Sequence, residues 1–166
     1  MTNILITGAN RGLGLGFVKR YLEKKVNVIC TTRRIPESKE LLACKAQYPN
    51  NLEILELDLL KEDAASNLAK LLKDKPIDIL INNAGVGSSN QHFEAVSSKP
   101  WLEVLKVNLI APLLITQSII DNVKKSSTKK IYFLSSQLGS IGENTSGGMY
   151  IYLSLIHISE PTRPID

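Results

Sequence analysis

Short, continuously apolar runs alternate with longer amphipathic stretches along the chain. The apolar runs are rich in Ile, Val and Leu and cover residues 3–6, 26–31, 52–57, 77–81 and 130–134. Helical periodicity fills the stretches near residues 13–25, 38–48, 62–74 and 100–124. Strands that are apolar at every position and separated by helices are typical of a parallel sheet covered on both faces. The pattern therefore predicts an α/β fold.

The order of these elements also predicts their arrangement. A chain of 166 residues is long enough for one domain with its own core. Because crossovers between parallel strands are right-handed, the five strands should form a doubly wound Rossmann sheet with the order 3-2-1-4-5. The ligand crevice of such a sheet lies beyond the carboxyl ends of strands 1 and 4, where the winding reverses.

A glycine-rich turn, TGANRGLG at residues 7–14, joins the first strand to the first helix. Gly8 permits the sharp turn, Gly12 lets the backbone approach a pyrophosphate, and Gly14 allows close packing of the helix on the strand. Free N–H groups and the helix dipole then hold the anion. The turn therefore predicts a dinucleotide site. The other predicted cofactor residues within it are Asn10, Arg11 and Leu13.

The end of the second strand indicates which dinucleotide binds. An enzyme that selects NAD usually has a carboxylate there, which accepts a hydrogen bond from the ribose 2′-hydroxyl. This chain instead has Arg33 and Arg34, with no acid before Glu37, and Arg11 lies in the glycine turn. Arginine can bind a phosphate through two hydrogen bonds. The residues favour NADP(H), with solvated surface arginines as the alternative.

Charge and composition narrow the possible partners. The net charge is +4, but Lys and Arg are spread along the chain, so we expect no nucleic-acid partner. The longest apolar stretch, residues 104–120, is interrupted by polar residues and a proline, so we expect no membrane span. Cys30 and Cys44 lack metal-ligand spacing and indicate buried thiols in a reducing compartment, here the cytoplasm. No metal site is expected.

Three further motifs follow the fourth and fifth strands. They are NNAG at residues 82–85, SSQLG at 135–139 and GGMYIY at 147–152. Together with TGANRGLG, they resemble the short-chain dehydrogenase/reductase family over residues 1–152. The stretch from residue 139 to residue 152 is most similar to the small carbonyl-reductase-like branch that includes the sniffer and C-factor proteins.

This resemblance implies roles for individual residues. It implies that Asn108, Ser136 and Tyr152 are the catalytic asparagine, serine and tyrosine, which act on a small carbonyl or alcohol substrate. A phenol and a hydroxyl can indeed donate a proton to a ketone oxygen and polarise it. Taken alone, Ser136 could instead cap a loop and Tyr152 could be a packed aromatic, but the ordered set of motifs favours the catalytic roles. A homo-oligomer is also implied. The remaining implied cofactor residues are Asp58, Leu59, Asn82, Asn83, Ala84 and Gly85.

Two local features bear on the chemistry. The family's tyrosine is followed four residues later by lysine, but this chain has Ile156 there. Pro112 lies four residues after Asn108 and has no N–H, so an α-helix here would leave the Asn108 carbonyl without a partner. The resulting kink could offer an acceptor to a bound water, or it could merely bend the helix around the sheet.

The last residues, 153–166, depart from the family pattern. They contain Pro161 and Pro164 and no amphipathic period, so no packed helix is expected. The run LSLIHISEPTR matches a translated sequencing adapter, and a natural frameshift or splice variant is the alternative. We therefore expect a native domain at 1–152, truncated at the start of the active-site helix, and a non-native tail. The expected protein is an inactive fragment of an NADP(H)-dependent oxidoreductase; the alternative is a non-catalytic nucleotide-binding module.

Overall fold

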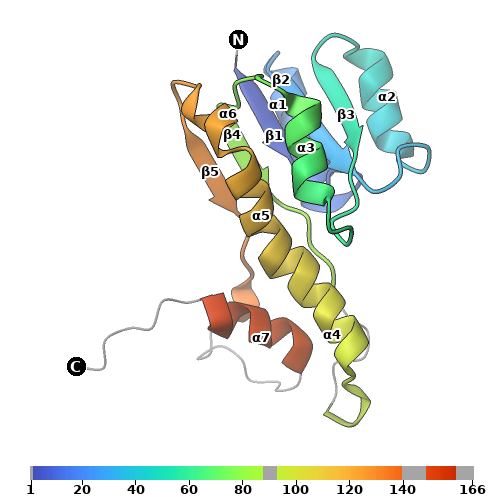
Figure 1. Cartoon of the computed structure of the whole chain (residues 1–166). Coiled ribbons are helices and arrows are strands. Elements are labelled where there is room, and N and C mark those ends of the chain that lie inside the picture. The colour runs from blue at the N-terminus through green and yellow to red at the C-terminus, as the bar shows by residue number, and fades with distance from the viewer. Residues whose placement is uncertain (1, 88–92, 140–148, 160–166) are drawn as a thin grey trace.

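Five parallel strands form one sheet, as predicted (Figure 1). The computed structural model describes residues 2–87, 93–139 and 149–159. Its strand order is β3-β2-β1-β4-β5, which confirms the doubly wound topology. β1 pairs with β2 and β4, and Leu5 lies opposite Ile29 and Leu80. The strands are β1 (Asn3–Ile6), β2 (Asn27–Thr32), β3 (Leu52–Glu56), β4 (Ile79–Asn82) and β5 (Lys130–Phe133).

Helices cover both faces of this sheet, which explains the continuous apolar strands. On one face, Ile4, Ile6 and Cys30 pack against α1 (Gly12–Glu23) and α2 (Lys39–Gln47). On the other face, Leu5 and Leu80 pack against three helices. These are α3 (Ala64–Leu72), α5 (Ala111–Ser118) and α6 (Ile120–Lys124). Successive residues of one strand therefore enter two different cores.

The helix predicted over residues 100–124 is divided into several segments. α4 (Ser98–Leu105) leads into a π-helical turn, η2 (Lys106–Ile110), and then into α5 and α6. Within this turn the Ala111 N–H donates to the carbonyl of Lys106, five residues earlier. Pro112 lies directly after Ala111. The kink expected near Asn108 therefore takes the form of a π-turn within one continuous helix (Figure 1).

The expectation that no helix packs after residue 152 is wrong. α7 (Tyr150–Ser159) extends beyond that point, and Ile151 and Leu155 are buried, at 0% and 6% exposure. Together with Val104 of α4 they form a small third cluster. Two apolar residues four apart, on one side of a helix, were enough to bury a face. Residues 140–148 of the family-like stretch, and Pro161 and Pro164 of the tail, lie outside the described residues.

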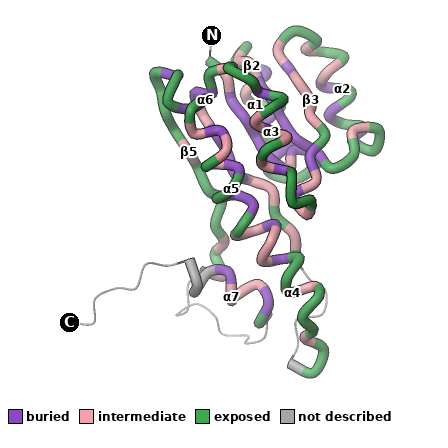
Figure 2. Tube along the Cα trace, viewed as in Figure 1, coloured by how far each residue is buried: buried purple, intermediate pink, exposed green. Residues whose placement is uncertain are grey.

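The two edges of the sheet differ in how far they are covered (Figure 2). In β3, Leu52 is 1% exposed and the next three residues are half-buried. In β5, by contrast, Tyr132 and Phe133 are 47% and 55% exposed. The β5 edge therefore presents apolar side chains to solvent over most of its length.

Candidate functional site

A cleft of about 600 Å³ lies at the carboxyl ends of β1, β2 and β4. This is where the strand order reverses, as expected for a doubly wound sheet. The glycine-rich turn, the end of β2, the segment after β3 and the segment after β4 all contribute to its lining. The predicted cofactor residues in the lining are Gly8, Asn10, Arg11, Gly12, Leu13, Gly14, Arg33, Asp58, Leu59, Asn83, Ala84 and Gly85.

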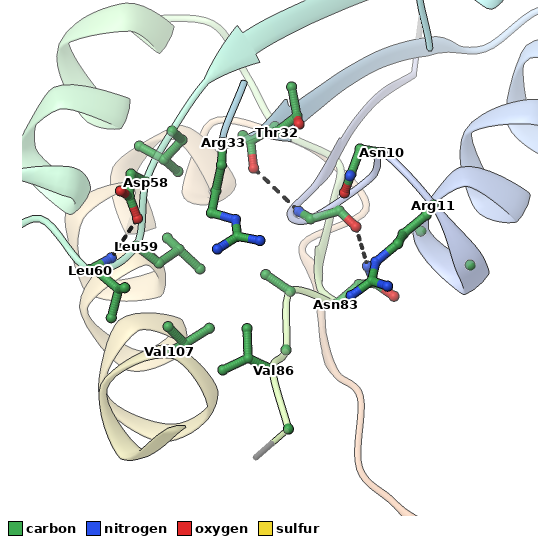
Figure 3. A pocket seen from close by; sticks show the side chains of 18 of the residues that line it. Asn10, Arg11, Thr32, Arg33, Asp58, Leu59, Leu60, Asn83, Val86 and Val107 are labelled. Atoms are coloured by element: carbon green, nitrogen blue, oxygen red, sulfur yellow. Dashed lines mark hydrogen bonds between the residues drawn. The ribbon is translucent and has the colours of Figure 1, made fainter. Parts of the chain in front are cut away.

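The glycine-rich turn is braced from both neighbouring strands. Asn83 donates from its side-chain amide to the carbonyls of Thr7 and Gly8, both at 2.9 Å. The Thr7 hydroxyl accepts from the backbone N–H groups of Asn83 and Ala84, both at 3.1 Å. From the β2 side, the Thr31 hydroxyl accepts from the Gly8 N–H at 3.3 Å. The turn is therefore held in shape by hydrogen bonds to both neighbouring strands, and some of these bonds are drawn in Figure 3.

The glycines of the turn serve different purposes. Gly8 has φ +65°, and a Cβ there would lie 2.6 Å from Cα of Ala84. A Cβ on Gly14 would collide with Nδ2 of Asn83 and would lie 2.5 Å from the carbonyl oxygen of Gly8. Gly12 also has a positive φ, of +58°, but a Cβ there would meet no atom within 4 Å. Packing therefore excludes side chains at Gly8 and Gly14, whereas Gly12 leaves open space at the start of α1.

The two arginines after β2 have different surroundings. Arg34 pairs with Glu37 at 2.7 Å, and that hydrogen bond raises the pKa of the Arg34 guanidinium. Arg33 lines the cleft, and its guanidinium projects into the open middle (Figure 3). Among the described residues, no hydrogen bond or ion pair engages the Arg33 side chain. The sequence could not distinguish these two residues, and the structure does.

Another part of the cleft lining is largely apolar. Leu59, Leu60, Val86 and Val107 line it (Figure 3). Asp58 lies at its end, and its Oδ1 accepts from the Leu60 N–H at 3.0 Å. Sequence analysis missed several lining residues because apolar residues and loop residues carry no motif. The lining residues that were missed are Thr31, Thr32, Leu57, Leu60, Val86, Gly87, Pro100, Glu103, Val104 and Val107.

Asn82 is the one predicted cofactor residue that does not line the cleft. It is 5% exposed, and its side-chain amide donates to the Thr116 hydroxyl of α5 at 3.2 Å. Its Oδ1 is buried with no hydrogen-bond partner among the described residues. As the last residue of β4, Asn82 faces the α5 layer, whereas Asn83 reaches the glycine turn.

The family model for short chain dehydrogenases matches residues 2–152 of this chain. The chain belongs to the short-chain dehydrogenase family. The family of the sequence-based resemblance is therefore confirmed.

Individual members of the family support a carbonyl-reductase-like branch. The carbonyl reductase Sniffer of Drosophila melanogaster superposes with a TM-score of 0.84 at 34% identity, covering 95% of this chain and 70% of that one. A carbonyl reductase from Pseudomonas aeruginosa in complex with NADP gives 0.81 at 29%, covering 95% and 71%. A probable NADP-dependent dehydrogenase of Haemophilus influenzae is 28% identical over 92% of this chain and 62% of its own length. This chain spans less than two thirds of the length of the curated relatives that it matches.

Asn108, the predicted catalytic asparagine, is hydrogen-bonded to the segment after β4. Its Oδ1 accepts from the Val86 N–H, and its Nδ2 donates to the Val86 carbonyl, both at 2.8 Å. Both ends of the amide are therefore engaged by a segment that lines the cleft. Asn108 sits within the π-turn, so this pair of bonds joins the irregular part of the long helix to the cleft wall.

Ser136 and Tyr152 lie outside the lining of the cleft. Ser136 precedes the short 3₁₀ helix η3 (Gln137–Gly139), and its hydroxyl accepts from the Leu138 N–H at 3.2 Å. Tyr152 is half-buried on α7, beside the small cluster shared with α4. α7, which carries Tyr152, contacts α4 and also η3, the short helix that directly follows Ser136.

The described residues contain no group of three or more His, Cys, Asp or Glu side chains placed to hold a metal ion. Within the same part of the chain, none of the helices has the length and apolar character needed to cross a bilayer.

Proposed function

We propose that the cleft binds NADP(H), with Arg33 and Arg11 holding the 2′-phosphate. The observation that carries this proposal is the Arg33 guanidinium, which projects into the cleft beside a strand end that has no carboxylate (Figure 3). Arginine can bind a phosphate with two parallel hydrogen bonds, and a carboxylate there would repel it. The NADP complex of the Pseudomonas aeruginosa carbonyl reductase supports the same cofactor.

The rest of the cleft fits the other parts of the dinucleotide. The open space beside Gly12, at the start of α1, would admit a pyrophosphate to the helix N–H groups. Leu59 and Val107 would pack against the flat adenine, and Asp58 could accept a hydrogen bond at its edge. Asn83 holds the loop beside this site through its bonds to the Thr7 and Gly8 carbonyls.

Titration of the chain with NADPH and NADH tests this proposal. We expect NADPH to bind more tightly, and Arg33→Met to weaken NADPH binding about tenfold or more, with little effect on NADH. Arg34→Met is the matched control, because Arg34 is already engaged by Glu37. Tighter binding of NADH by the unmodified chain, measured by ligand fluorescence, would refute the cofactor assignment.

The reaction that we propose, because the chain belongs to this family, is hydride transfer between NADP(H) and a small carbonyl or alcohol. The nicotinamide supplies or accepts the hydride when the cofactor is bound. Tyr152 would donate a proton to the carbonyl oxygen, and the Ser136 hydroxyl would hydrogen-bond the same oxygen. Asn108 would hold the cleft wall through Val86.

For the chain as it stands, we propose nucleotide binding without useful turnover. A phenol ionises near pH 10 in water, so proton transfer near neutral pH depends on a neighbouring cation. The family has a lysine four residues after the tyrosine, whereas this chain has an isoleucine, Ile156, without a charge. This feature also favours the alternative function, a non-catalytic nucleotide-binding module. Consumption of NADPH with aldehydes or ketones, abolished in Tyr152→Phe, would refute inactivity.

We also propose self-association, in a reducing compartment such as the cytoplasm. A stripe of large apolar side chains lies exposed along α4, η2 and α5, and such stripes mark association surfaces. The residues are Leu102, Ile110, Leu113 and Leu114, at 63%, 48%, 65% and 43% exposure. Leu113→Glu should lower the mass measured by light scattering; a monomeric unmodified chain would refute this part. The buried, unpaired Cys30 and Cys44 support the reducing compartment.

A further inference from the structure

The loop that carries Arg33 is closed by one buried hydroxyl. This loop, residues 33–38, joins the end of β2 to the start of α2. Ser38, at its far end, is 3% exposed. Its Oγ donates to the Arg34 carbonyl at 2.9 Å and lies 2.9 Å from the hydroxyl of Thr32, the last residue of β2. One side chain therefore links the strand, the loop and the helix.

The direction of these two bonds follows from counting protons. A serine hydroxyl has one proton, and Ser38 gives it to the Arg34 carbonyl. The Thr32 hydroxyl must therefore donate to Ser38 Oγ in the contact between them. Thr32 lines the cleft, but its only side-chain proton is already committed. The Thr32 side chain therefore has no proton left to donate to an anion in the cleft. That hydrogen bond must come from arginine.

Ser38 is also the residue at the amino end of α2, where serine usually caps the helix. Its side chain makes no capping bond there, and its backbone has φ −91° and ψ 60°. A serine at this position ordinarily accepts from an N–H in the first helical turn. Here the hydroxyl stabilises the loop instead of the helix. Its burial and its bonds therefore serve the shape of the segment that carries Arg33.

The loop has one further backbone bond, from the Ser38 N–H to the Ile35 carbonyl at 2.9 Å, and its remaining contacts are exposed. Arg34 pairs with Glu37 at the surface, and the Ile35 N–H donates to Oε2 of Glu56 at 3.3 Å. Exposed ion pairs contribute little to holding a geometry. The Thr32–Ser38–Arg34 chain of hydrogen bonds is centred on a buried side chain, and it fixes the carbonyl of Arg34, the residue directly after Arg33.

We propose that Ser38 is a positioning residue that directs Arg33 into the cleft and so sets the preference for NADP(H) over NAD(H). Ser38 does not line the cleft and acts through the backbone of Arg34. The inference rests on the proposed cofactor. It assigns cofactor selection to a hydroxyl outside the binding surface, in addition to the arginines within it.

The test compares Ser38→Ala with the unmodified chain, using NADPH and NADH as probes. We expect NADPH affinity to fall about threefold to tenfold, the value of one hydrogen bond, and NADH affinity to stay the same. Ser118→Ala is the matched control. Its hydroxyl also donates to a backbone carbonyl, that of Ile115 at 2.9 Å, but it lies on α5 away from the cleft lining.

A double-mutant cycle shows whether Ser38 acts through Arg33. In the Arg33→Met background, Ser38→Ala should cause no further loss of NADPH preference. Thr32→Val should reproduce the loss and Thr32→Ser should not, because serine keeps the donor. This pair carries the test if Ser38→Ala does not fold, as judged by circular dichroism.

Three results would overturn the inference. Equal weakening of NADPH and NADH by Ser38→Ala would indicate a merely structural residue. Full retention of NADPH preference in Ser38→Ala, with loss in Arg33→Met, would overturn the inference and leave the proposed cofactor standing. Equal affinity of the unmodified chain for both dinucleotides would overturn both.

Discussion

The proposed nucleotide-binding region and the region of the predicted catalytic residues differ in how much of each is buried. The first, formed by β1–β4 with α1–α3 and α5, encloses two large cores, and Leu5 and Ile6 of its central strand are fully buried. In the second, formed by β5, η3 and α7, β5 pairs with β4, and α7 packs on α4 through a cluster in which three of the described residues are buried. In Figure 2, burial is concentrated in the first region, while β5 is mostly exposed. The proposed binding and the predicted chemistry would thus depend on parts of unequal burial.

The largest expected difference is in the effect of truncating one side chain in each region. Leu5→Ala should lower the free energy of unfolding by about 2–5 kcal/mol, because it opens a cavity in a closed core. Phe133→Ala removes a larger side chain that is 55% exposed and should cost less than about 1 kcal/mol. Urea unfolding followed by circular dichroism measures both. Equal costs would show that β5 is as well packed as β1.

Two glycines within the first region, Gly8 and Gly16, should differ in the effect of adding a methyl group on stability. Gly8→Ala should cost about 1–3 kcal/mol, because the new Cβ meets Ala84 and the backbone has positive φ. Gly16→Ala, in the middle of α1, meets nothing within 4 Å and should stabilise the helix by about 0.5–1 kcal/mol. Thermal melting should therefore shift in opposite directions for the two variants. A shift of the same sign would contradict the account of the turn.

Alkaline pH should weaken the first region through Cys30. Burial raises the pKa of this thiol to about 12, with a smaller contribution from Cys44, above the ordinary value of 9.0. The folded state therefore keeps its proton when the unfolded state has lost it. The resulting stability is complete below pH 9 and is lost as the pH rises toward 12, by at most about 1.4 kcal/mol per unit. Cys30→Ala should show a shallower decline in urea unfolding over this range; identical slopes would contradict it.

The smallest expected effect is a shift in the unfolding curve of the region formed by β5, η3 and α7. Trp101 is the chain's one tryptophan, and its Nε1 donates to the Ser154 hydroxyl of α7 at 2.9 Å. Its fluorescence should change at a lower urea concentration than circular dichroism, because the small cluster opens before the two main cores. Trp101 fluorescence and circular dichroism curves that coincide would show that the two regions unfold as one.

The sequence predicted the parts of the fold that depend on local patterns. Apolar runs bounded the strands to within two residues, and the glycine spacing placed the turn at the cleft, because these features follow from burial and from backbone geometry. It predicted neither the π-turn at residues 106–110 nor the bonds between Asn108 and Val86. Those depend on which distant segment packs against the helix.

The site was predictable to the extent that residue type determined role. Arg33 and Arg34 are chemically identical, and only Glu37 and the fold place one in the cleft and the other outside it. Ser38 carried no signal in the sequence that set it apart, because its role depends on the hydroxyl of Thr32 and the carbonyl of Arg34 beside it in the fold. α7 was missed because its apolar face consists of two positions whose partner is the distant Val104.

The π-turn also marks the point at which the long helix can lose a residue without changing its register. A π-turn contains one residue more than the α-helical path between the same ends. Deleting one residue from 106–110 would therefore restore a plain helix with α4 and α5 still in phase, so that Trp101 and Val104 would keep facing α7. Deleting one residue from within α4 or α5 would instead rotate one end of the long helix by about 100° relative to the other. Such a deletion would change how the two regions are oriented, whereas the π-turn could absorb one.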